Sequence, residues 1–324
     1  MSTSMPMIFV HVHYPEIWED MAREIAELCD KPFGLVLTHY GSAPLARPQT
    51  PCLAFCKEIV VENRGRDVLP FLQALRADLP PFEIGLKLHT KRSPHRDDGP
   101  QWRQFLTASL LAHNDEGLSA YQLMSEDSRI GIIAPQGHLL PLLGRVALNG
   151  PQMKKMLAAL GINTSIAALD DERFAAGTMF WFRRKAVAPF MDPALKSLFE
   201  PEESQLDGTA AHAAERLFAF VCEKEGFFAT AMEAVTPLLA AIRDAKQTGS
   251  DAVLPLATLR SISERAYLEA VNPFSMPLAS FWAKHRKLLL LAHLTYRHVP
   301  SPVWRAARRL IRRYTKRDPS DSPA

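Results

Sequence analysis

Short apolar runs alternate with segments of helical periodicity through the first part of the chain. The runs 7–12, 34–38, 58–61 and 84–86 are brief and rich in Ile, Val and Leu, as buried strands are. Between the first two, a helical pattern places apolar residues on one face: Ile17, Met21, Ile25 and Leu28. Alternation of strands and helices of these lengths predicts an α/β fold with a mixed, mainly parallel sheet flanked by helices.

Polar clusters follow two of the predicted strands. One spans residues 62–67 and the other residues 87–92. Because ligands of open α/β sheets bind beyond the carboxyl ends of the strands, we expect both clusters to face one pocket. Their Lys and Arg side chains would make it positive, which suits a phosphate-bearing ligand. The candidate binding residues are Asn63, Arg64, Arg66, Asp67, Lys87, His89, Thr90 and Lys91.

A structural interpretation of the same clusters stays open. Asp67 also fits the N-cap of a helix predicted to begin at Val68. The 87–93 stretch could equally be a basic surface loop in which His89 is structural. A capping role of Asp67 can coexist with the pocket, whereas a surface loop at 87–93 would leave the pocket without some of its expected cations.

Basic charge is concentrated near the end of the sequence. Residues 271–317 contain eleven Lys or Arg and no Asp or Glu, whereas the rest of the chain has a net charge of −8. Within this stretch, 301–317 has the pattern of a basic amphipathic helix of the interfacial kind. We expect residues 284–317 to meet an anionic membrane surface. A nucleic-acid-binding arm and a partner-docking helix are the alternatives, and nothing else in the chain favours nucleic acid.

The pattern also divides the chain. We expect an α/β domain over 1–244, a helical extension over 245–317 and a disordered tail over 318–324. No apolar run reaches the ~18 residues that span a bilayer, and the first residues lack a secretory pattern. The four cysteines have no zinc-ligand spacing, so we expect reduced thiols and a cytoplasmic location.

Six motifs in one order resemble the rhamnan synthesis F family of bacterial cell-surface polysaccharide assembly. They are 12–15 (Val-His-Tyr-Pro), 62–67, 87–93, Trp102-Arg103, 176–181 and 207–217. The resemblance covers roughly residues 5–235 and implies a GT-A-type glycosyltransferase with a Rossmann-related sheet. The implied reaction transfers a sugar, often L-rhamnose, from a nucleotide-sugar donor such as dTDP-L-rhamnose to a glycan or lipid-linked glycan. Such an enzyme would sit at the inner face of the plasma membrane.

The resemblance gives the candidate residues specific roles. Asn63 and Asp67 would contact the base or ribose, and Arg64 and Arg66 would neutralise the diphosphate. Cations at 87–91 would repel a divalent metal and could replace it, so we expect no cofactor and no need for Mg²⁺. The acidic run 170–172 is the rival metal site, although such a run is more often a solvated loop.

Inverting transfer needs a general base that accepts the proton of the acceptor hydroxyl. Asp207, just before a predicted helix, is the first candidate, with His212 and Glu215 as substitutes on that helix. Gly177 and Trp181 would form an acceptor platform, with core packing as the alternative for Trp181. A non-catalytic carbohydrate- or nucleotide-binding scaffold is the competing function.

Overall fold

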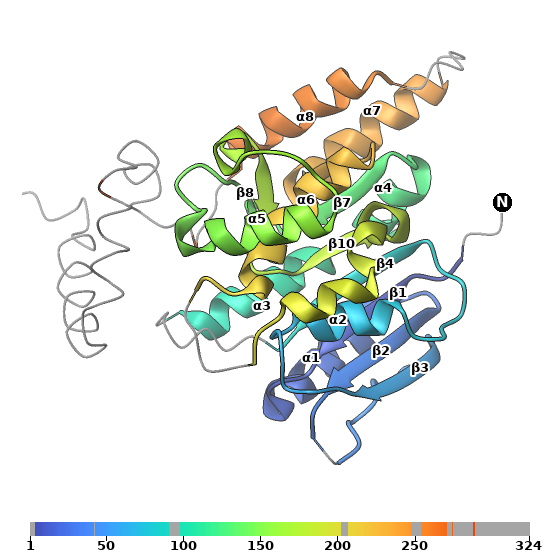
Figure 1. Cartoon of the computed structure of the whole chain (residues 1–324). Helices are drawn as coiled ribbons and strands as arrows, with labels where there is room; N and C mark the ends of the chain where they lie inside the picture. Colours follow the sequence, from blue (N-terminus) through green and yellow to red (C-terminus); the bar gives the residue numbers. More distant parts are fainter. Residues whose placement is uncertain are drawn as a thin grey trace, which may run out of the picture.

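A seven-stranded sheet forms the centre of the computed structural model (Figure 1). The structure describes residues 4–41, 43–90, 98–201, 207–247 and 254–270, together with Phe274 and Leu288. The strand order is β11-β7-β10-β4-β1-β2-β3. All neighbouring pairs are parallel except the two that involve β10. The carboxyl ends of six strands and the start of β10 therefore share one edge of the sheet.

The strands are β1 (Met7–His11), β2 (Phe33–His39), β3 (Leu53–Val60), β4 (Ile84–His89), β7 (Ile130–Ala134), β10 (Phe180–Arg183) and β11 (Phe228–Ala231), with the short pairs β5 (His113–Asn114) with β6 (Gly117–Leu118) and β8 (Leu139–Pro141) with β9 (Arg173–Ala175). The helices are α1 (Pro15–Leu28), α2 (Val68–Leu75), α3 (Gly99–Leu110), α4 (Ser119–Glu126), α5 (Gly150–Ala159), α6 (Ala210–Lys224), α7 (Val235–Gln247) and α8 (Leu256–Glu269). Short 3-10 helices are η1 (Ala147–Asn149), η2 (Ile166–Leu169), η3 (Arg184–Met191), η4 (Pro193–Leu198) and η5 (Met232–Ala234).

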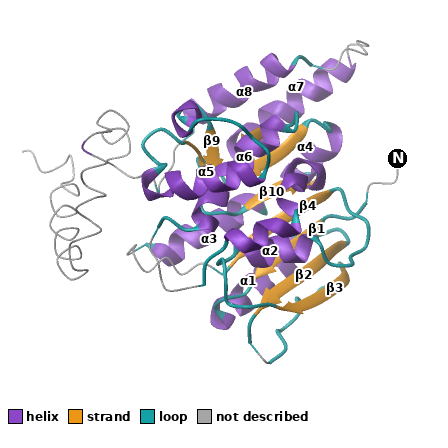
Figure 2. Ribbon diagram, viewed as in Figure 1, coloured by secondary structure: helices purple, strands orange, loops and turns teal. Residues whose placement is uncertain are grey.

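Helices cover both faces of the sheet (Figure 2). On one face α2 and α6 pack against side chains such as Phe9 and Phe182, with α5 outside them. On the other face α1, α3, α4 and α7 cover side chains such as Ile8 and Trp181. Because side chains alternate along a strand, a sheet covered twice must be apolar on both faces, which explains why β1, β2 and β4 are buried throughout.

The predicted mixed α/β fold with a mainly parallel sheet is confirmed. Within the motif 176–181, β10 begins only at Phe180, because Gly177 and Thr178 adopt positive φ angles of 92° and 58° and form a turn ahead of it. Strand β11 and helices α7 and α8 were not predicted from the sequence. The expected domain boundary at 244/245 falls inside α7, and α8 packs against β11 and α7.

Some predictions fall outside the described residues. They concern Lys91, the basic helix over 301–317 and the tail over 318–324. Among the helices that the structure describes, none combines the length and apolar character needed to cross a bilayer.

Candidate functional site

A buried ion pair lies at the carboxyl edge of the sheet. Lys87 near the end of β4 is 1% exposed, and its Nζ donates to Asp67 Oδ2 at 2.5 Å and to the Thr178 carbonyl at 2.8 Å. The ammonium also lies 5.3 Å from the centre of the Phe71 ring. Burial lowers the pKa of Lys87, and the Asp67 carboxylate opposes that shift. Lys87 is therefore committed to protein partners and joins three segments: β4, the 62–67 loop and the turn before β10.

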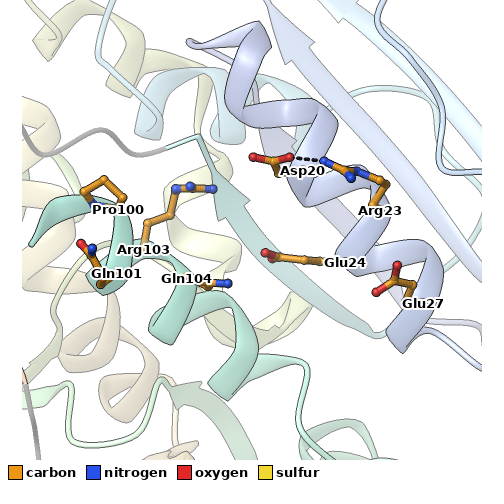
Figure 3. Close-up of a pocket in the computed structure, with 8 residues that line it drawn as sticks. All are labelled: Asp20, Arg23, Glu24, Glu27, Pro100, Gln101, Arg103 and Gln104. Atoms are coloured by element: carbon orange, nitrogen blue, oxygen red, sulfur yellow. Dashed lines mark hydrogen bonds and ion pairs between the residues drawn. The ribbon is translucent and has the colours of Figure 1, made fainter.

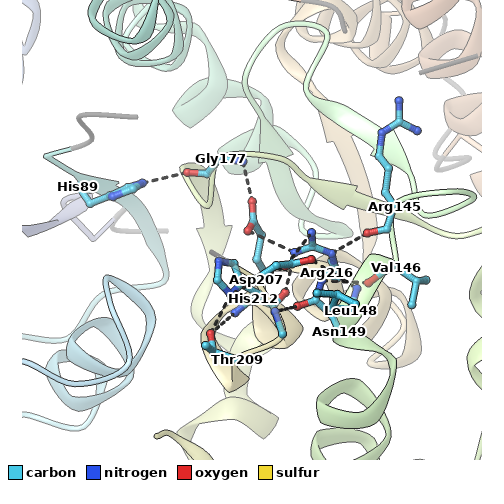
Figure 4. Close-up of polar contacts among 12 residues, drawn as sticks. His89, Arg145, Val146, Leu148, Asn149, Gly177, Asp207, Thr209, His212 and Arg216 are labelled. Carbon is cyan, nitrogen blue, oxygen red and sulfur yellow. Dashed lines mark hydrogen bonds and ion pairs between the residues drawn. The ribbon is translucent and has the colours of Figure 1, made fainter. Parts of the chain in front are cut away.

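A second chain of hydrogen bonds runs from β4 to α6 through one glycine (Figure 4). His89 Nε2 donates to the Gly177 carbonyl at 2.9 Å, and Gly177 N donates to Glu215 Oε1 at 2.8 Å. His89 Nδ1 lies 3.9 Å from Asp67 Oδ1, which links this chain to the buried pair. The Gly177 φ angle of 92° is one that a Cβ-bearing residue rarely adopts. Gly177 therefore has a clear role in the site, as a backbone bridge between His89 and Glu215.

The start of α6 holds the remaining acid–base candidates (Figure 4). Asp207 Oδ1 lies 3.7 Å from Arg216 Nη2 and 4.0 Å from His212 Nδ1, while Oδ2 accepts from Leu148 N at 3.4 Å. The N-cap of α6 is Thr209, whose hydroxyl also contacts His212 Nδ1 at 2.8 Å. Asp207 is thus not the helix cap, and its carboxylate is held by long contacts at the rim of the cluster.

Burial sets the protonation state of two histidines. It lowers the pKa of His212 to about 4, with the nearby Arg66 guanidinium adding to the shift. It lowers the pKa of His11, in β1, to about 3. Both imidazoles are therefore neutral near pH 7. Thr38 Oγ1 lies 3.1 Å from His11 Nδ1, so this ring has a polar partner in the core.

We expect His212 to make the protein acid-sensitive. A histidine whose folded-state pKa is depressed has no effect on stability above its unfolded pKa of 6.5, and it costs stability as the pH falls from 6.5 to about 4. When the pH falls from 7 to 5, the free energy of unfolding of wild type should therefore drop by about 2 kcal/mol more than that of His212→Gln. Urea titrations at the two pH values measure this difference. The exposed His113→Gln serves as control, and equal pH dependence in wild type and His212→Gln would refute the assignment.

The other predicted binding residues have distinct surroundings. The Arg64 guanidinium donates to the Phe199 carbonyl, from Nε at 2.8 Å and Nη2 at 2.5 Å, so it fastens the 62–67 loop to η4. Thr90 Oγ1 accepts from the backbone amides of His13 and Tyr14 and anchors the start of α1. Asn63 is exposed, whereas Arg66 is half-buried and close enough to His212 to act on its charge. Of these residues, Arg66 lies nearest to the acid–base candidates of α6.

Trp181 is the clear correction among the predicted site residues. Its side chain is 0% exposed and its Nε1 donates to the Leu110 carbonyl at 2.7 Å. A sugar needs an accessible ring face, so the predicted acceptor-stacking role of Trp181 is wrong. The aromatic strand packs in the core on both sides, because the sheet is covered on both faces.

The structure does not support the alternative role of Asp67 as a helix cap. It occupies the N-cap position of α2, but its carboxylate makes no capping hydrogen bond and turns to Lys87 instead. The acidic run 170–172 forms a turn before β9. Within the residues that the structure describes, no group of three His, Cys, Asp or Glu side chains is arranged to hold a metal ion.

Several supporting residues were missed. Asn149 is fully buried, and its Oδ1 accepts from Gly208 N at 3.0 Å. Glu200 Oε2 accepts from Ala210 N at 3.1 Å, and Arg216 Nε donates to the Arg145 carbonyl at 2.8 Å. These contacts position the first two turns of α6. They join segments up to 71 residues apart, so no local pattern could have indicated them.

Comparison with known proteins gives consistent matches. The sequence profile of the family described as "Rhamnan synthesis protein F" matches residues 2–227. Two relatives from Xanthomonas campestris pv. campestris, strains B100 and ATCC 33913, are each 34% identical over 234 residues and carry the name "Uncharacterized protein WxcX". Each match covers 70% of this chain and 32% of the relative, so the chain spans about a third of the length of these curated relatives.

Proposed function

The chain belongs to the rhamnan synthesis protein F family, and from that premise we propose that it is a glycosyltransferase that adds a sugar from a nucleotide donor to a cell-surface glycan. The family ties the chain to rhamnan polysaccharide synthesis. The transferase activity, the GT-A type, dTDP-L-rhamnose as donor, inversion and a glycan or lipid-linked acceptor are parts of the proposal. One observation carries it: polar groups from the 62–67 loop, β4, the turn before β10 and α6 meet at the edge where α/β proteins bind ligands.

The surroundings of each residue suggest its role. Arg66 would neutralise the diphosphate, with Lys91 as its proposed partner from outside the described residues. Asp207 would accept the proton of the acceptor hydroxyl. The buried pair of Lys87 and Asp67 would hold His89 and the Gly177 turn in place. In this scheme His212 and Glu215 position Asp207 and Gly177 instead of reacting themselves.

Donor binding tests the proposal directly. Calorimetric titration with dTDP-L-rhamnose and other nucleotide sugars should give binding by at least one donor. We expect Arg66→Ala to weaken that binding by about 10- to 100-fold, the effect of losing a charge-assisted hydrogen bond to phosphate. Arg47→Ala, an exposed arginine before β3, is the matched control and should leave the affinity unchanged. Absence of binding by every nucleotide sugar would refute the proposal.

The same titration in EDTA tests whether binding is independent of metal ions. If EDTA abolished binding and Mg²⁺ restored it, metal independence would be contradicted.

A binding scaffold is the second candidate function, and one observation favours it. Two of the cations expected to meet a diphosphate, Arg64 and Lys87, are engaged by protein groups instead. A scaffold would bind a nucleotide or glycan yet tolerate loss of Asp207. Measuring transfer and binding together in the Asp207 variant discriminates the two functions.

We further propose that residues 284–317 attach the protein to an anionic membrane surface on the cytoplasmic side. The excess of cations in this segment is the observation that supports it. Truncation after Val299 should release the protein from liposomes that contain phosphatidylglycerol at moderate salt. Pelleting with neutral liposomes is the control, and unchanged pelleting of the truncated protein with anionic liposomes would refute the proposal.

A further inference from the structure

A groove of about 360 Å³ lies between α1 and α3, and none of the residues of the polar cluster lines it (Figure 3). Helix α1 supplies one wall and the first turns of α3 supply the other. The lining residues are Asp20, Arg23, Glu24, Glu27, Pro100, Gln101, Arg103 and Gln104. Nothing in the proposed reaction uses this groove.

The groove is acidic along its α1 wall. Helix α1 carries Glu16, Glu19, Asp20, Glu24 and Glu27 against the single cation Arg23, which pairs with Asp20 (Figure 3). Glu24 is half-buried, and its pKa is raised by that burial and by the neighbouring carboxylates of Asp20 and Glu27, with Arg103 opposing. Crowded carboxylates favour a bound partner that brings positive charge.

The opposite wall points to a polypeptide partner. Arg103 Nε is buried and has no hydrogen-bond acceptor among the described residues. A peptide carbonyl could accept from this donor after the half-buried Arg103 side chain turns into the groove, whereas a bare amine or metal cation offers no acceptor. The chemistry of the groove therefore fits a basic segment of protein.

The chain itself brings such a segment close to the groove. Phe274 packs on Phe105 of α3, with ring centres 5.2 Å apart, and Phe105 directly follows the groove residue Gln104. The first cation after this contact is Lys284, ten positions further along. Ten residues span about 15 Å as a helix and at most about 36 Å when extended. The basic segment can therefore reach the groove in either conformation.

We propose that the groove between α1 and α3 binds the basic segment 284–317 of the same molecule. The segment contains eleven Lys or Arg and no acid, which complements the net charge of −4 on α1. This inference is independent of the proposed transferase activity. It has a consequence for the proposed membrane attachment, because a cation engaged by the groove is withheld from an anionic surface.

Zero-length cross-linking of carboxylates to amines tests the contact on the full chain. At low protein concentration and low salt, mass spectrometry should find Lys284, Lys287 or Lys316 joined to Asp20, Glu24 or Glu27. Because exposed ion pairs are screened by salt, these products should be lost at about 0.5 M NaCl. A mixture of ¹⁴N- and ¹⁵N-labelled protein separates links within one molecule from links between molecules. Links only between molecules, or from the groove only to Lys91, would overturn the proposal.

Proteolysis gives a second and independent measurement. In Asp20→Asn/Glu24→Gln/Glu27→Gln, trypsin cleavage within 284–317 should become about tenfold faster, the combined effect of losing three ion pairs at the rim of the groove. The matched control Asp78→Asn/Asp115→Asn/Glu225→Gln neutralises three exposed acids on other surfaces and should cleave like wild type. Circular dichroism establishes that both variants are folded. Equal cleavage rates in the two variants would contradict docking in the groove.

Discussion

Replacing Lys87 with methionine should lower the free energy of unfolding by about 3–5 kcal/mol, the cost of breaking a buried ion pair by removing one partner. Methionine is unbranched like lysine, only one heavy atom shorter, and fits among Phe71 and Phe180, so lost packing contributes little. The Asp67 carboxylate, 9% exposed as a residue, would then remain without its cation. The Thr178 carbonyl would also lose a donor. Urea unfolding at pH 7 followed by circular dichroism measures the loss.

Two further variants make this result specific. Lys154→Met changes an exposed lysine on α5 and should alter stability by no more than about 0.5 kcal/mol. The double variant Asp67→Asn/Lys87→Met removes both charges and should regain part of the lost stability, because a neutral amide is cheaper to bury than a carboxylate. A loss below 1 kcal/mol in Lys87→Met would mean that the pair contributes little to the fold.

The fold was predictable because the apolar pattern and the layers of the structure have the same cause. Segments 7–12, 34–38 and 84–86 are apolar at every position except His11 and Thr38, and only a sheet covered on both faces buries such a segment completely. Strand β11 was not predicted, because its sequence Phe-Ala-Thr-Ala is short and its side chains are mostly small, so it lacks the apolar pattern of a buried strand. Its burial depends on α8, where Ser263 contacts Thr230 at 2.7 Å.

The site was predictable in place but not in the role of each side chain. The 62–67 loop, β4 and the start of α6 could be predicted to lie at one edge of the sheet, because the carboxyl ends of parallel strands meet there. It could not show that Lys87 points into the core toward Asp67, since a strand end leaves both directions open. The burial of the Trp181 ring could not be predicted from the periodicity of its strand. Whether the ring is exposed or covered depends on α3 and α4, which come from elsewhere in the chain.

Replacing Asp207 with asparagine should reduce the turnover number by about 10²–10⁴-fold with little change in KM, if this residue takes the proton of the acceptor. Of the three candidates on and before α6, Asp207 has the most exposed side chain, at 22%. His212 is less accessible to an acceptor, because its side chain is only 12% exposed and its Nδ1 already contacts the Thr209 hydroxyl at 2.8 Å. Asparagine keeps an oxygen that can accept from Leu148 N, so the fold should remain intact.

A variant of the neighbouring Glu215 distinguishes a residue that reacts from one that only positions the site. In Glu215→Gln an amide oxygen can still accept from Gly177 N, so turnover should fall only a few-fold. Asp171→Asn changes an exposed acid in the turn before β9 and should leave turnover unchanged. Transfer by all three variants is compared with the same donor and glycan acceptor. Turnover within tenfold of wild type in Asp207→Asn would eliminate Asp207 as the base, and a full loss in Glu215→Gln would transfer the role to Glu215. If donor binding persists in Asp207→Asn while wild type itself shows no transfer, the scaffold function is the better account, because the site would then bind without reacting.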